Sequence, residues 1–135
     1  MIKHIFSILA FMVVSFSVQG TSHFVINADH FASVGFLRPG PIMPLGLAAM
    51  ILEGFIMSVA LSRFMPGGST VRDGLAVSAA FGLFLASYIV LAEPAKYAVP
   101  SISNWMVIEA TASCIQFSVF GLLLGFIHRK KAVVA

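Results

Sequence analysis

Polar side chains recur along one face of the first long apolar segment of this sequence. Successive members lie four, four, four and three residues apart, and they are Ser15, Gln19, His23, Asn27 and His30. At 3.6 residues per turn, this spacing places all of them on a single stripe of a helix. A second stripe near the C-terminus comprises Glu109, Ser113 and Gln116, and Glu53 lies near the middle of another apolar segment. Because polar groups in a membrane are costly without partners, we expect these stripes to face one another inside a helical bundle.

The depth of these side chains predicts two polar layers. A rise of about 1.5 Å per residue gives an outer layer about 6 Å below one membrane boundary and a deeper layer roughly 12 to 16 Å below it. The outer layer contains His23, Tyr88 and Glu109. The deeper layer contains Gln19, Glu53 and Gln116. Together with Asn27, these residues form the predicted intramembrane polar site.

Glu53 is the member of this set best suited to chemistry. An intramembrane carboxyl without a charged partner is a candidate proton-exchanging group, whereas a nearby histidine would pair with it. The alternative interpretation is that the amides and hydroxyls only join helices, through hydrogen bonds that contribute about 0.6 kcal/mol each.

Residue types that commonly bind metals and cofactors do not occur in a recognisable binding motif in this sequence. His23 and His30 could offer nitrogens to a metal or haem, but seven residues along one helix separate them by about 10 Å, too far to share one ion. Motifs of phosphate-binding loops, dinucleotide sites, zinc hydrolases and nucleophile elbows are absent from the sequence. We therefore predict no cofactor, no metal site and no catalytic residue. Proton transfer by Glu53 or His23 in an intramembrane enzyme remains an alternative.

The elements that position these residues follow from composition. Of the 135 residues, 59% are hydrophobic and 10% are charged, and the mean hydropathy is +1.01. Soluble domains carry about 25% charged residues, so we predict one domain embedded in a lipid bilayer. Stretches of about 20 apolar residues, enough to cross a membrane, occur at 5–27, 43–64, 75–92 and 105–127. The net charge is +3, but the basic residues do not form a patch with aromatic residues between them. Nucleic-acid binding is therefore not expected.

Short connections join these stretches and make neighbouring spans antiparallel. Proline and glycine occur in the first two connections, at 38–41 and 66–69, and prolines in the third, at 93–101. Asp73 precedes the third span and Ser101 or Ser103 precedes the fourth, so these residues are predicted helix N-caps. The predicted fold is an all-α, four-helix transmembrane bundle with up-down-up-down topology.

Basic residues predict its orientation. Lys3, Arg63 and Arg72 lie at the N-terminus and in the second connection, and three more basic residues follow the fourth span at 129–131. The other connections hold only Arg38 and Lys96. The positive-inside rule places both termini in the cytoplasm. Alternatively, residues 1–20 are a cleaved signal peptide, which would leave three spans with unchanged orientation.

Two segments carry a resemblance to known proteins. They are residues 23–31, with His23 to Asn27 and His30-Phe31, and residues 100–117, where Pro100 to Trp105 leads to Glu109 and Gln116-Phe117. Because of these two segments, the chain resembles small four-span bacterial inner-membrane proteins of uncharacterised function. The resemblance implies the fold and a bacterial setting, and it assigns no activity.

Three functions are consistent with these features. The first is an accessory or structural membrane subunit, in contact with the lipid bilayer and assembled as a homo-oligomer or within a larger complex. The second is a small-solute or proton-handling protein that uses the Glu and His residues. The third is a haem, quinone or metal binder.

Overall fold

Four long apolar helices make up most of the structure, a computed structural model that describes residues 1–38 and 40–129. The segments with the length and composition to cross a membrane are Ile2–Ile26, Met43–Phe64, Val71–Lys96 and Ile102–Ile127. No strand occurs among the described residues. The predicted fold class, an all-α membrane bundle, is confirmed, and the protein is a multi-pass membrane protein.

Two of the four spans contain a wider π-helical turn. The first span comprises α1 (Ile2–Thr21) and the π-turn η1 (Ser22–Ile26), and the short helix α2 (Ala28–Ala32) follows it. The second span is α3 (Met43–Phe64), with the bounds expected from the sequence. The third comprises α4 (Val71–Ser87), the π-turn η2 (Tyr88–Ala92) and α5 (Glu93–Lys96), and the fourth is α6 (Ile102–Ile127).

The ends of the third and fourth spans are fixed by side-chain caps. Thr70 is the N-cap of α4, and its hydroxyl accepts a hydrogen bond from the backbone N–H of Asp73 while the Asp73 carboxylate accepts one from Thr70 N at 2.8 Å. The prediction of Asp73 as the N-cap was therefore wrong, because Asp73 is the third helical residue of a capping box. Ser101, one of the two serines predicted as candidates, caps α6.

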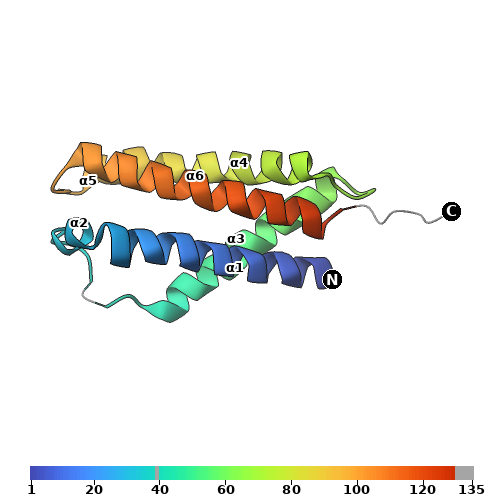
Figure 1. The fold of residues 1–135 in the computed structure, drawn as a ribbon, viewed down its shortest axis with the longest axis horizontal. Coiled ribbons are helices and arrows are strands. Elements are labelled where there is room, and N and C mark those ends of the chain that lie inside the picture. Colours follow the sequence, from blue (N-terminus) through green and yellow to red (C-terminus); the bar gives the residue numbers. More distant parts are fainter. Residues whose placement is uncertain (39, 130–135) are drawn as a thin grey trace.

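The helices pack as two pairs (Figure 1). α4 lies along α6, α1 packs on α3, and α1 also contacts α6, whereas α3 and α4 touch over a much smaller area. Figure 1 shows α3 crossing α1 obliquely. We call the end with the N-terminus, the 65–70 connection and His128 the N/C end, and the end with α2 and α5 the distal end.

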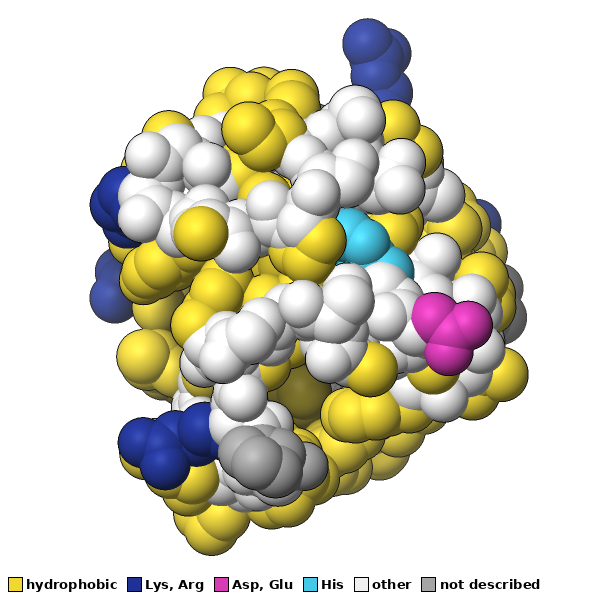
Figure 2. All heavy atoms as spheres, turned by 90° about the vertical axis from the view of Figure 1, so that its left-hand side faces the viewer, with side chains coloured by type: hydrophobic (Ala, Val, Ile, Leu, Met, Phe, Trp, Pro, Cys, Tyr) yellow, Lys and Arg dark blue, Asp and Glu magenta, His cyan; other side chains and the backbone are white. Residues whose placement is uncertain are grey.

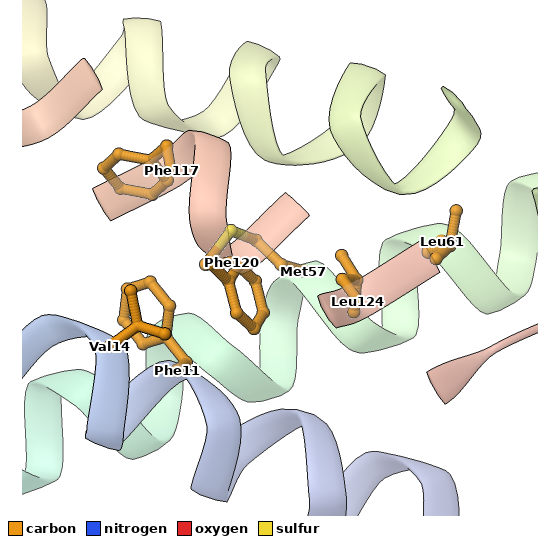
Figure 3. Close-up of a cluster of buried hydrophobic side chains, with 7 residues drawn as sticks. All are labelled: Phe11, Val14, Met57, Leu61, Phe117, Phe120 and Leu124. Carbon is orange, nitrogen blue, oxygen red and sulfur yellow. The ribbon is translucent and has the colours of Figure 1, made fainter. Parts of the chain in front are cut away.

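A cluster of apolar side chains joins α1, α3 and α6 in the middle of the bundle (Figure 3). It consists of Phe11, Val14, Met57, Leu61, Phe117, Phe120 and Leu124. Phe11 and Phe120 have no exposed surface, and their rings meet edge to face with centroids 4.8 Å apart. This cluster separates the polar groups of the N/C end from those of the distal end.

Candidate functional site

A cavity of about 410 Å³ lies in the distal half of the bundle, where α3 and α4 make little contact with each other. All four spans line it. Its polar residues are Ser15, Gln19, His23, Glu53, Glu93, Glu109, Ser113 and Gln116. Figure 2 shows the distal face of the molecule, where charged side chains lie toward the rim and a hollow opens among apolar side chains.

One wall of the cavity is a chain of hydrogen bonds between α1 and α6. The Gln116 amide donates to Ser15 Oγ at 2.9 Å, and the Gln19 amide donates to Gln116 Oε1 at 2.7 Å. Gln116 is buried. These hydrogen bonds lower the cost of placing the two amides within the membrane, although Gln19 Oε1 is buried and has no hydrogen-bond partner among the described residues.

The next turn of the same interface holds a histidine–glutamate pair. His23 Nε2 lies 3.3 Å from Glu109 Oε1, and His23 Nδ1 lies 2.8 Å from the Gln19 carbonyl oxygen. Because a carbonyl oxygen only accepts, Nδ1 carries a hydrogen. A second proton must lie between Nε2 and Oε1 for them to attract, so the pair is either imidazolium with carboxylate or imidazole with carboxylic acid. The pair therefore holds one exchangeable proton.

Two further carboxyl groups line the cavity. Glu53 from α3 is partly exposed and forms no hydrogen bond or ion pair with another described residue. Glu93, from the start of α5, lines the same cavity as Glu109. The cavity thus combines three carboxyls and one imidazole, an arrangement suited to accepting and releasing protons.

The structure brings most of the predicted site residues together. Gln19, His23, Glu53, Glu109 and Gln116 all line this one cavity, so the two expected layers share a single space.

Two predicted site residues lie elsewhere. Asn27 donates to Ser22 Oγ at 3.2 Å and lines a separate groove between α1 and α6. Tyr88 is 50% exposed on the outer surface, and its hydroxyl accepts a hydrogen bond from Lys96. The depth of a residue does not determine the direction of its side chain, which explains why Tyr88 points away from the cavity.

Sequence analysis missed Glu93 and a second polar cluster at the N/C end. The Glu93-Pro94 pair was interpreted as the start of a loop, but the helix continues to Lys96 and turns Glu93 into the cavity. The second cluster contains His4, Ser7, Ser58, Ser62 and His128. Its only sequence signal is two histidines next to the ends of the spans.

The histidines of the distal end do not form a metal centre. The His23 ring packs on Phe31 with centroids 3.8 Å apart, and His30 lies against Phe31 and Trp105. Within residues 1–38 and 40–129, no group of three or more His, Cys, Asp or Glu side chains is arranged to hold a metal ion.

Comparison with known proteins assigns no family. No family model matches the chain, and no curated protein or solved structure matches it either.

Proposed function

We propose that this protein is a proton-handling membrane protein and that the distal cavity is its proton-exchanging site. The observation that carries the proposal is the cavity in which the His23–Glu109 pair and the unpaired carboxyl of Glu53 meet. Groups that gain and lose protons need a partner of similar proton affinity and contact with water.

The size of the cavity supports this function. A volume of about 410 Å³ accommodates about 14 water molecules, at about 30 Å³ each. Water in this space would connect Glu53 with the His23–Glu109 pair and with Glu93. A small polar solute would fit the same space, and it is the alternative cargo of the site.

We also propose a setting for this function. The basic residues of the N/C end favour its placement in the cytoplasm, which turns the distal cavity toward the opposite side. The resemblance to small four-span bacterial proteins favours the inner membrane.

A second candidate is an accessory or structural membrane subunit. The hydrogen bonds from Gln116 to Ser15 and from Gln19 to Gln116 favour it, because they join α1 to α6 without any need for exchange. Under this function, the polar groups only hold the bundle together for a partner to bind.

Proton flux into proteoliposomes separates the two candidates. The full chain is reconstituted with an entrapped pH-sensitive dye, and a potassium gradient with valinomycin drives proton entry. We expect flux well above that of empty vesicles, and we expect Glu53→Gln and His23→Asn to lower it by about tenfold or more. Asp29→Asn, which removes an exposed carboxyl outside the cavity, is the matched control and should not change the flux.

Two outcomes would reject proton handling. One is wild-type flux equal to that of empty vesicles, and the other is full flux in both cavity variants. In either case, unchanged assembly of Glu53→Gln and His23→Asn would favour the structural subunit.

A further inference from the structure

The N/C end contains a buried polar cluster that the proposed function does not use. The imidazole of His128, directly after α6, lies among serines from α1 and α3. His128 Nε2 lies 3.1 Å from Ser7 Oγ and 2.9 Å from Ser58 Oγ, and His128 Nδ1 lies 3.2 Å from Ser62 Oγ. Ser7 and Ser58 are fully buried, and His128 is 5% exposed.

Hydrogen-bond directions assign the protons of His128. The Ser62 hydroxyl donates to the Ser58 carbonyl oxygen at 2.9 Å, so Ser62 Oγ can only accept from His128 and Nδ1 carries a hydrogen. The Ser7 hydroxyl donates to the Lys3 carbonyl oxygen at 2.9 Å, so Ser58 is the one neighbouring serine that can donate to His128 Nε2. The pKa of His128 is lowered to about 4, so the ring is neutral near pH 7 and Ser58 is its donor.

The His4 side chain completes the chain of hydrogen bonds. Because the Ser58 hydroxyl donates to His128, its oxygen accepts from His4 Nδ1, 2.8 Å away. The two imidazole centroids are 5.7 Å apart. The resulting order, from His4 to Ser58 to His128, connects a partly exposed imidazole with a buried one.

The same cluster holds the end of α6 against the rest of the bundle. The His128 carbonyl oxygen accepts from Ser69 N at 3.0 Å, and the Arg129 carbonyl oxygen accepts from Lys3 Nζ at 3.3 Å. Side chains of α1 and α3 and the 65–70 connection therefore all contact the segment that follows α6. These contacts close the bundle at the N/C end.

A proton on His128 would oppose this closure. Burial, together with the nearby His4 and Lys3, lowers the pKa of His128 from 6.5 to about 4. Lys3 and His4 face His128 from α1, while α3 and the 65–70 connection contribute the uncharged Ser58, Ser62 and Ser69. Protonation reverses the bond to Ser58 and places a positive charge beside two basic residues.

We propose that the N/C end opens when His128 takes up a proton. Opening exposes the imidazole to water, where its pKa returns to about 6.5. The open form therefore binds one proton more than the closed form between about pH 4 and 6.5. Within this range, the ratio of open to closed molecules rises by up to about tenfold for each unit that the pH falls.

A distance measurement at the N/C end tests the proposal. Nitroxide labels are attached to Arg63→Cys on α3 and Phe126→Cys on α6, both exposed positions, in a chain whose single cysteine is replaced by Cys114→Ser. Double electron–electron resonance in lipid nanodiscs then follows their separation from pH 8 to 4.5. We expect a population with longer distances to grow as the pH falls below about 6.5.

Three histidine variants identify the group that takes up the proton. His128→Gln keeps a donor and an acceptor but cannot titrate, so its distances should not change with pH. His4→Gln retains His128 but removes a neighbouring basic group that lowers its pKa, so opening should still depend on pH, with a changed midpoint. His30→Gln leaves the N/C end intact and should keep the wild-type pH dependence.

Two results would overturn the proposal. One is a pH-dependent distance that persists in His128→Gln, and the other is a wild-type distance that does not change down to pH 4.5. The second result needs no variant, so it holds even if His128→Gln fails to fold. Neither labelled position lines the distal cavity. The outcome of this test therefore does not depend on whether the proton-flux test supports proton handling.

Discussion

Phe120 occupies the centre of the apolar cluster between the two polar ends (Figure 3). Its side chain has no exposed surface, and it packs against Phe11 from α1. In a lipid environment, burial between helices gains little from the removal of water, so its stabilising effect comes from close packing. A packing defect here would weaken the contact of α6 with α1.

Phe120→Ala should lower the free energy of unfolding by about 3 to 5 kcal/mol, because the cavity left behind lacks contacts. The measurement is unfolding by SDS in mixed micelles, followed by the fluorescence of Trp105, the single tryptophan. Phe126→Ala is the control, since Phe126 is 56% exposed toward lipid, and should change stability by about 0.5 kcal/mol or less. Equal effects of the two substitutions would contradict a central role for Phe120.

At the scale of residues, the sequence predicts neighbours on one helix better than partners on different helices. The steps of four between Ser15, Gln19 and His23 place them on one face, and all three line the cavity. The pairing of His23 with Glu109 depends on the relative rotation of α1 and α6, which packing determines. The His4–Ser58–His128 cluster was missed for the same reason, because its members are far apart in sequence.

Close contact between α4 and α6 depends on glycines. A Cβ atom at Gly74 would lie 2.3 Å from Gly125 N and 2.5 Å from Gly121 O, so no larger residue fits without separating the two backbones. Small residues at helix interfaces in membranes allow this close approach. The neighbouring Ser78 hydroxyl then donates to the Phe117 carbonyl oxygen at 2.6 Å.

Gly74→Ala should therefore destabilise the pairing of α4 with α6, by about 1 to 3 kcal/mol for an overpacked contact. Gly46→Ala in α3 is the matched control, since a Cβ there meets nothing within 4 Å, and it should leave stability unchanged or raise it by up to about 1 kcal/mol. The same SDS unfolding assay compares them. A Gly74→Ala protein as stable as Gly46→Ala would show that the helices can move apart without cost.

At the scale of elements, the lengths of the apolar stretches predict the four spans. Proline, glycine and capping residues are less reliable guides to where each helix begins and ends. The bounds of α3 follow from its apolar run, whereas the third span extends from Val71 to Lys96 rather than from 75 to 92. Thr70 starts this helix earlier than expected, and the helix continues past Pro94 to Lys96. The π-turn η2 had no signal in the sequence.

The N-terminus, the 65–70 connection and the end of α6 lie at one end of the molecule (Figure 1). Lys3, Arg63, Arg72 and Arg129 belong to this N/C end, whereas Arg38 and Lys96 belong to the distal end. This asymmetry of charge is what the positive-inside rule uses, so the orientation can be tested directly.

In intact cells, a membrane-impermeant maleimide should label Ala98→Cys at the distal end and should not label Gly67→Cys at the N/C end. Both substitutions are made in the Cys114→Ser chain, and both positions are exposed. Permeabilised cells provide the control, because both cysteines should then react. Labelling of Gly67→Cys alone in intact cells would reverse the orientation and place the cavity toward the cytoplasm.

Contact between Lys3 and Arg129 brings the first turn of α1 next to the residue that follows His128. A short flexible linker in place of residues 130–135 could therefore join Arg129 to the start of α1 without stretching either helix. New termini placed in the connection before α3 would then give a circular permutant. In that permutant α1 and α6 would be consecutive, so their hydrogen-bonded interface would form within one helical hairpin.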